Sequence, residues 1–250
     1  MSEKPGTGDD GHTAWVRITH WVIALSFVTL AFTGFAILRT HPRLYWGEVG
    51  NDLTPALLEL PISRNLQHGG WVDARPFFED ADGPISAERT YAILNHNSWG
   101  RSLHFLAGWV LVATGVVYLL SGIVSGHIRR HLAPRSGELT PRLLWQDLGR
   151  HLRRQIRSPT GGPQYGLLQK CAYLGVVIVG LPLMVLTGLA MSPAVTAAYP
   201  VLSDLFGGFQ SARTIHFFLF AALVLFLVGH VLMVVLSGFG RQIRAMTIGE

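Results

Sequence analysis

Cysteine is nearly absent from this sequence of 250 residues, which contains only Cys171. One thiol excludes an intramolecular disulfide and a four-cysteine iron–sulfur site, and the chain has no CxxCH motif for covalent haem attachment. Any haem in this protein must therefore be held without a covalent bond.

Charge is also scarce, because 14% of the residues are charged and 49% are hydrophobic, whereas about 25% are charged in an average soluble domain. Four long apolar runs account for this composition, and none of them contains Asp or Glu. A helix needs roughly 20 such residues to cross a bilayer. We therefore predict an all-α membrane protein, a bundle of four transmembrane helices at about residues 17–38, 102–126, 167–191 and 213–240.

The polar segments suggest one membrane domain, residues 14–246, after a disordered tail of residues 1–13. Lys and Arg are most concentrated in the connection 127–166, whereas the connection 39–99 contains more acidic than basic residues. The positive-inside rule then places both termini and the basic connection in the cytoplasm and residues 39–99 outside the inner membrane. The net charge of +5 is explained by this topology and by contact with membrane lipid, so we expect no nucleic acid partner.

The two long connections carry further local patterns. In the outer connection, aromatic residues favour a folded cap, with short helices expected at residues 54–59 and 86–94. In the basic connection, Thr140 is a predicted N-cap, followed by apolar residues at helical spacing. That pattern fits a helix lying on the membrane surface, and an ordinary solvated basic loop remains an equal alternative.

Two histidines lie within the last apolar run, His216 and His230. Their separation of fourteen residues is four helical turns less roughly 40°, so both rings leave the same helix face, about 21 Å apart along the axis. Imidazole is costly in hydrocarbon and is treated there as functional. This helix therefore offers one ligand near each membrane surface.

The other two intramembrane histidines match these depths. His20, early in the first span, is level with His230, late in the fourth, and this pair lies near the cytoplasm. His104 and His216, each a few residues into a span that enters from outside, are also level. Four histidines thus form two predicted pairs. The remaining histidines lie in tails or loops and receive no ligand role.

Paired imidazoles from facing helices suit haem b, whose iron takes axial nitrogen ligands from opposite sides. With both positions filled, iron cannot bind substrate, so electron transfer is the expected role. Glycines that would let a flat macrocycle approach the helices are Gly34, Gly108, Gly115, Gly188 and Gly229. A histidine-lined metal transporter is the remoter alternative, disfavoured because the four runs lack acidic residues.

Three of the histidines follow an arginine by three residues: Arg17 precedes His20, Arg101 precedes His104 and Arg213 precedes His216. Each arginine lies about one turn nearer the membrane surface, where haem propionates would emerge. Snorkelling at helix ends is the alternative explanation. We expect propionate pairing in at least one site.

Four spans and these histidines resemble the bacterial cytochrome b561 and nickel-hydrogenase cytochrome b family, which includes the gamma subunit of formate dehydrogenase. The resemblance covers roughly residues 14–246, and the segments RSLHF, GLLQKCAY, LTGLAMSP and FQSARTIHF are most similar to the thiosulfate-reductase cytochrome b branch. It implies two haems b that carry electrons between a quinone near His20 and His230 and a periplasmic redox subunit near His104 and His216.

The resemblance also implies where quinone binds. A family motif, Asn-x-Gly-Gln-Lys, aligns with residues 166–170, where only Gln169 and Lys170 match. The expected partner is a molybdopterin oxidoreductase or a cytochrome, with residues 39–99 as the docking surface. We therefore expect an electron-transfer subunit, with no catalytic residues of its own, more than a complete enzyme. The alternative is a free-standing superoxide:quinone oxidoreductase, whose relatives have shorter outer loops.

Overall fold

The structure is a computed structural model of the whole chain. It describes residues 13–40, 42–51, 54–62, 66–67, 70–71, 97–129, 140, 142–143, 145–146, 149 and 167–249. The predicted tail, the predicted helix at residues 86–94 and most of the basic connection lie outside these residues. At the start of the predicted surface helix, the Leu143 amide donates to Thr140 Oγ1 at 3.3 Å, so Thr140 is the N-cap that the sequence predicted.

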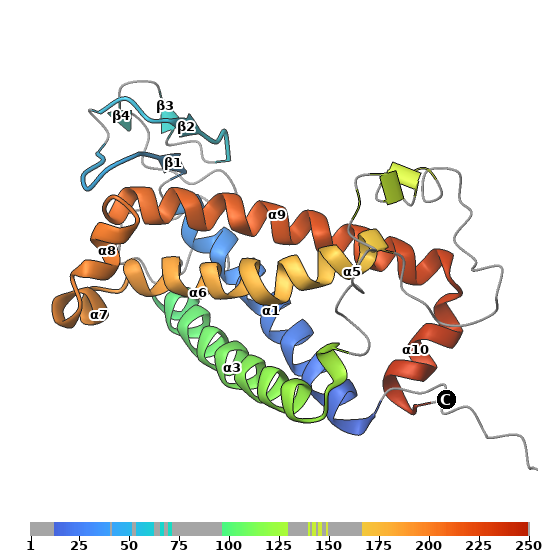
Figure 1. Cartoon of the computed structure of the whole chain (residues 1–250). Helices are drawn as coiled ribbons and strands as arrows, with labels where there is room; N and C mark the ends of the chain where they lie inside the picture. Colours follow the sequence, from blue (N-terminus) through green and yellow to red (C-terminus); the bar gives the residue numbers. More distant parts are fainter. Residues whose placement is uncertain are drawn as a thin grey trace, which may run out of the picture. The chain divides into compact units, whose positions relative to one another are not determined.

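Four helical stretches are long and apolar enough to cross a membrane, as the sequence predicted. Three are single helices: α1 (Ala14–Thr40), α3 (Asn97–Val124) and α9 (Phe209–Leu236). The fourth combines α5 (Leu167–Leu174), the π-helical segment η2 (Gly175–Gly180) and α6 (Leu181–Ala190). Figure 1 shows these stretches in the colours of the sequence. Because of its four apolar helices the protein is a multi-pass membrane protein.

The π-helical turn has a local cause. Pro182 has no amide hydrogen, and its ring clashes with the carbonyl four residues earlier, at Ile178. A widened turn over residues 175–180 removes this conflict without breaking the span. The sequence predicted an interruption at Pro182, and the structure shows that the helix accommodates it by changing its hydrogen-bond spacing.

The described residues divide into two compact units. Unit 1 comprises the described residues within 1–23, 114–176 and 224–250, and unit 2 comprises those within 24–113 and 177–223. The long helices pass through both. Each unit contains two of the four intramembrane histidines: His20 and His230 belong to unit 1, whereas His104 and His216 belong to unit 2.

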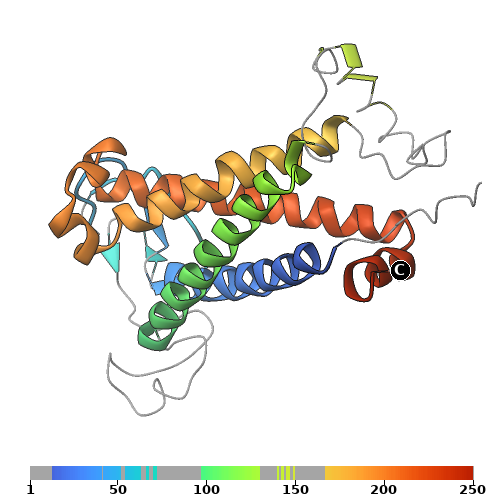
Figure 2. The ribbon, with the colours of Figure 1, turned by 60° about the horizontal axis from the view of Figure 1, so that its bottom comes forward.

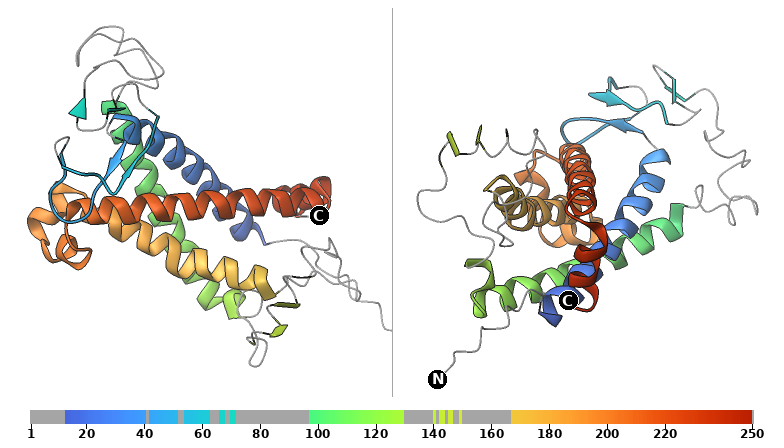
Figure 3. Two further views of the ribbon diagram at one scale, coloured as in Figure 1. Left: turned by 90° about the horizontal axis from the view of Figure 1, so that it is seen from above. Right: turned by 90° about the vertical axis from the view of Figure 1, so that its right-hand side faces the viewer.

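In unit 2, the start of the connection 39–99 is folded against the beginning of α9. Strand β1 (Arg43–Leu44) pairs antiparallel with β2 (Leu58–Glu59), and β1 lies beside α9 (Figures 1 and 3). The predicted helix at residues 54–59 is therefore wrong. The pairing is reinforced by Arg43, which is 2% exposed and donates from Nη2 to Glu59 Oε1 at 2.7 Å. A second hairpin joins β3 (Leu66–Gln67) to β4 (Gly70–Trp71).

The beginning of α9 is capped by that connection. Gly47 O accepts the amides of Gln210 and Ser211, and Glu48 Oε2 accepts the Phe209 amide at 3.0 Å. A carboxylate is favourable there because a helix N-terminus carries partial positive charge. Gly208, at φ +107°, permits this approach, since a β-carbon on it would lie 2.7 Å from Gly47 backbone atoms.

Short helices complete each unit. In unit 2, α7 (Pro193–Ala198) and α8 (Val201–Leu205) link α6 to α9 (Figure 2). In unit 1, the chain turns at Gly238, whose φ is +104°, and continues as the amphipathic α10 (Phe239–Thr247) (Figure 3). Trp21 Nε1 donates to Met246 O at 2.9 Å, which ties the end of α10 to α1.

Candidate functional site

The structure places the four intramembrane histidines in two pairs with tilted rings, one pair within each unit. In the unit 1 pair, the ring centres of His20 and His230 are 6.2 Å apart and the ring planes are inclined by 52°. In the unit 2 pair, the corresponding values for His104 and His216 are 6.4 Å and 56°. These are the same pairs that the helical period and the topology predict from the sequence.

Both separations fit one metal ion between two imidazoles. A ligating nitrogen lies about 1 Å from its ring centre and about 2 Å from the metal, so two axial imidazoles have ring centres about 6 Å apart. Imidazoles in direct van der Waals contact through their faces would be closer, and a hydrogen-bonded pair would need one ring to donate to the other. The ring separation of each pair therefore leaves room for one metal ion between its two imidazoles.

In the unit 2 pair, each ring is held by a buried threonine. Thr33 Oγ1 lies 2.9 Å from His104 Nδ1, and Thr187 Oγ1 lies 2.9 Å from His216 Nδ1. Both threonine side chains are fully buried. A second hydrogen bond at the nitrogen that does not bind metal is the usual support for a metal-ligating histidine, because it fixes the ring orientation and the tautomer.

A glycine follows each of these threonines and makes room for the ring. A β-carbon on Gly34 would lie 3.4 Å from His104 Cε1, and one on Gly188 would lie 3.5 Å from His216 Cε1. These are ordinary contact distances, so a methyl group fits there and a larger side chain does not. Of the five glycines proposed from the sequence, these two lie against the ligand rings. For Gly108, Gly115 and Gly229, the space is open within 4 Å.

Sequence reasoning missed the two threonines. The sequence signal for them is an internal repeat. In each copy, a Thr-Gly pair on one membrane span is followed, at the start of the next span, by a five-residue segment that begins with Arg and ends with His-Phe. The first copy comprises residues 33–34 and RSLHF at residues 101–105, and the second comprises residues 187–188 and RTIHF at residues 213–217. In both copies the threonine contacts the histidine of the following segment.

The unit 1 pair has a different environment, made of aromatic and amide side chains. His230 Nδ1 lies 3.3 Å from Tyr173 Oη, and Gln169 Nε2 donates to the same oxygen at 2.9 Å. Phe226 stacks on the His230 ring with an angle of 17° between planes, and Trp21 meets His20 edge-on. Gln169, which was predicted from the sequence, is thus one side chain removed from His230, and Tyr173 is an addition.

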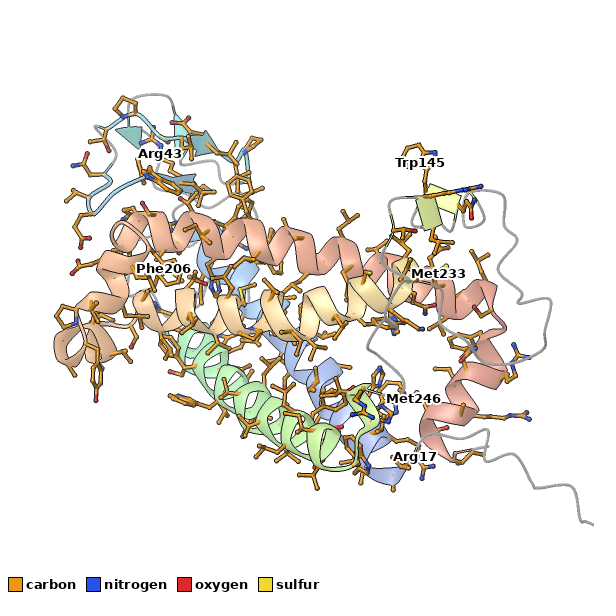
Figure 4. All side chains as sticks on the ribbon, viewed as in Figure 1. Arg17, Arg43, Trp145, Phe206, Met233 and Met246 are labelled. Carbon is orange, nitrogen blue, oxygen red and sulfur yellow. The ribbon has the colours of Figure 1, made fainter. Side chains whose placement is uncertain are left out.

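The other predicted site residues lie at the helix ends. Arg17 is half-buried, and a β-carbon on Gly249 would collide with its guanidinium, so the C-terminal residues pack against it (Figure 4). Arg213 is half-buried and donates to Gln210 Oε1 at 3.4 Å, whereas Arg101 is exposed. Lys170 is half-buried beside Gln169 on α5. Their pairing with haem propionates or quinone stays a prediction.

Comparison with known proteins adds a relative and a family. The chain is 29% identical over 239 residues to a protein of Azospira oryzae named as putative protein-methionine-sulfoxide reductase subunit YedZ1, and the match covers 96% of each chain. No solved structure matches. A family model described as prokaryotic cytochrome b561 matches residues 11–249. The chain therefore belongs to the prokaryotic cytochrome b561 family and is a membrane protein of electron transport that uses haem b.

Proposed function

We propose that this protein is a dihaem b subunit that passes electrons between the quinone pool and a periplasmic oxidoreductase, across the bacterial inner membrane. The observation that carries the proposal is the presence of two separate imidazole pairs, each with the ring separation that one axially ligated iron needs. A single pair would serve one haem. Two pairs, one in each unit, would serve two haems.

The roles of the chain's own residues follow from this arrangement. His104 and His216 would hold one haem in unit 2, and His20 and His230 would hold the other in unit 1. Haem supplies reversible one-electron chemistry when bound, at a potential that its axial ligands and their hydrogen bonds control. With a histidine from each of two helices as its ligands, each iron would have no position left for substrate and would be restricted to electron transfer.

The first experiment is a haem count on the detergent-purified protein. We expect two haems b per chain in a pyridine haemochrome assay, one haem in His104→Ala and one in His230→Ala, with the two variants losing different components of a redox titration. One haem per wild-type chain, or loss of the same component in both variants, would overturn the dihaem proposal.

Quinone would react beside the unit 1 pair. Tyr173 joins His230 to Gln169 through its hydroxyl, which places polar groups at the edge of a ring that is otherwise packed by Phe226. A quinone carbonyl needs hydrogen-bond donors and its reduction needs protons, which hydroxyl and amide groups next to a redox site can supply or relay. We propose Gln169 and Tyr173 as this contact, with Lys170 and Arg17 nearby in unit 1.

The partner would dock on the outer connection. The Azospira oryzae relative is named as a subunit of a protein-methionine-sulfoxide reductase, so we propose a periplasmic reductase, of molybdopterin type, that receives electrons from this chain. The described part of the connection presents three exposed apolar side chains, Trp46, Val49 and Leu57. Exposed aromatic residues of this kind are frequent binding hot spots.

A pair of tryptophan variants tests this surface. Trp46→Asp should lower the affinity for the reductase at least tenfold, because a central aromatic contact commonly contributes more than about 1.4 kcal/mol. Trp145→Asp is the matched control, since Trp145 is also well exposed but belongs to the basic connection (Figure 4). Equal affinities for both variants, with both haems present, would refute docking at Trp46.

A further inference from the structure

We infer that Thr33 and Thr187 are positioning residues that hold both ligands of the unit 2 haem in one tautomer and thereby lower its reduction potential. The inference rests on the proposed haem function of the His104–His216 pair. Its structural basis is the hydrogen-bond direction at the two threonines, which is the same in both copies of the repeat.

Each threonine hydroxyl has backbone oxygens to which it can donate, which leaves its oxygen able to accept from the imidazole. Thr33 Oγ1 donates to the backbone oxygen of Thr29 at 2.7 Å, with that of Leu30 at 3.3 Å. Thr187 Oγ1 has two such acceptors, Leu183 O at 2.9 Å and Met184 O at 3.0 Å. A hydroxyl has one hydrogen to donate and two lone pairs. With the hydrogen committed, the contact to each histidine requires a hydrogen on Nδ1. Nε2 of both rings then carries the lone pair that a metal needs.

This arrangement makes both imidazoles stronger electron donors. An Nδ1–H group that donates to a good acceptor gives its ring more imidazolate character, which raises ligand basicity. A hydroxyl that itself donates to a carbonyl is a better acceptor, because consecutive hydrogen bonds polarise one another. A more basic axial ligand favours ferric over ferrous iron, so each threonine lowers the potential of the unit 2 haem.

The bond to the backbone is not sufficient evidence by itself, because threonines inside helices often make it. Thr29 makes the same bond, to Leu25 O at 2.9 Å, on the same helix as Thr33. What distinguishes Thr33 and Thr187 is complete burial together with a histidine nitrogen at 2.9 Å, repeated on α1 and α6. The same geometry in both copies of the repeat indicates a role toward the ring.

The experiment compares isosteric variants in the full-length purified protein. Thr33→Val and Thr187→Val remove the acceptor and keep the side-chain shape, whereas Thr33→Ser and Thr187→Ser keep the hydroxyl. Thr29→Val is the matched control. The readouts are the midpoint potential of each haem in a redox titration and the paramagnetic resonance spectrum of the ferric haems. The unit 2 haem is identified as the one that His104→Ala loses.

We expect each valine variant to raise the midpoint potential of the unit 2 haem by about 59 mV. For a one-electron couple, this shift lowers the ratio of oxidised to reduced haem about tenfold at a fixed ambient potential. Its ferric spectrum should change as well. The unit 1 haem, the serine variants and Thr29→Val should keep wild-type values, and the double valine variant should shift further than either single one.

Two outcomes would overturn the inference. The first is an unchanged unit 2 potential in both valine variants with two haems bound. The second applies if the valine variants lose the unit 2 haem. The serine variants should then still bind this haem at its wild-type potential. Loss of the haem in the serine variants as well would exclude a role for the hydroxyl. Failure of the proposed haem function gives a different result from failure of this inference. In that case the wild-type protein itself would lack the haem that His104→Ala is expected to remove.

Discussion

The two histidine pairs have nearly the same ring separation but differ in what surrounds them. The unit 2 pair is supported by two aliphatic hydroxyls whose hydrogens are committed to the backbone. The unit 1 pair is supported on one ring by a phenol that Gln169 also contacts. A threonine whose hydroxyl donates to its own helix backbone accepts from its histidine, whereas the Tyr173 hydroxyl, which accepts from Gln169, can donate or accept toward its histidine. Fixed support suits a relay, and adjustable support suits a site that exchanges protons with a substrate.

The two units also differ in how many of their side chains are buried. Among the residues that the structure describes, nearly all buried side chains belong to unit 2, and Val16 and Thr19 are the exceptions in unit 1. A tightly packed site keeps its ligands in one geometry, which reduces reorganisation during electron transfer. A more open site admits a substrate. The two histidine pairs therefore differ in how tightly their surroundings are packed, as the two proposed roles would require.

The largest effect is expected at Gly188, where the close packing of unit 2 can be broken. Gly188→Val would place branched carbon beyond a β-carbon that already meets the His216 ring at 3.5 Å, so the ring must move. We expect haem content to fall from two per chain to one, measured by pyridine haemochrome. Gly188→Ala, which adds only the β-carbon, should keep two. Two haems in the valine variant would contradict a tight cradle.

The next effect tests the adjustable support in unit 1. Tyr173→Phe removes the hydroxyl between Gln169 and His230, and we expect quinone turnover to fall about 10- to 100-fold, the usual range for loss of an outer-shell partner. Stopped-flow oxidation of the reduced protein by quinone measures it. The potential of the unit 2 haem should stay the same. Tyr118→Phe, on α3 of unit 1, is the control, and an equal loss there would refute a specific role for Tyr173.

The folded start of the outer connection gives a stability test confined to unit 2. Glu59→Gln should lower the free energy of unfolding by about 3 kcal/mol, the low end for breaking a buried ion pair, because Arg43 is 2% and Glu59 27% exposed. Denaturant titration in mixed micelles, followed through each haem, checks that the unit 2 haem is lost first. Glu48→Gln keeps an acceptor for the Phe209 amide and should cost under about 1 kcal/mol. Equal costs for the two variants would contradict the ion-pair argument.

The smallest effect concerns α10 in unit 1. Trp21→Phe removes one exposed hydrogen bond, to Met246 O, which should cost about 1 kcal/mol and accelerate amide exchange in α10 about fivefold. Mass spectrometry of hydrogen exchange measures this, with Trp145→Phe as the control. Unchanged exchange would show that apolar contacts alone hold α10.

Much of this arrangement follows from the sequence. The four apolar helices and the family were predicted and are confirmed. The two histidine pairs follow from the helical period, because a difference of fourteen residues returns to nearly the same face and topology then fixes which ends are level. These features could be predicted because they depend on the sequence of each single helix and on the direction in which that helix crosses the membrane.

The parts that sequence reasoning missed depend on contacts between helices. Thr33 lies 71 residues before His104, and a Thr-Gly pair in an apolar helix looks the same whether it packs against a helix or a ligand. Tyr173 was missed for the same reason. The predicted helix at residues 54–59 failed because Leu58 and Glu59 pair with Arg43 and Leu44, a contact that local propensity does not include.

The capping of α9 by Gly47 and Glu48 has a thermodynamic consequence. The helix begins in bonds to the outer connection, and His216 follows Ser211 by only five residues, so the backbone state of the connection and the position of that ring are energetically linked. Linkage is reciprocal. A partner that binds this connection more tightly when the unit 2 site is reduced must raise the affinity of that site for electrons by the same factor. For such a partner, docking and reduction of the unit 2 site would be coupled in one equilibrium.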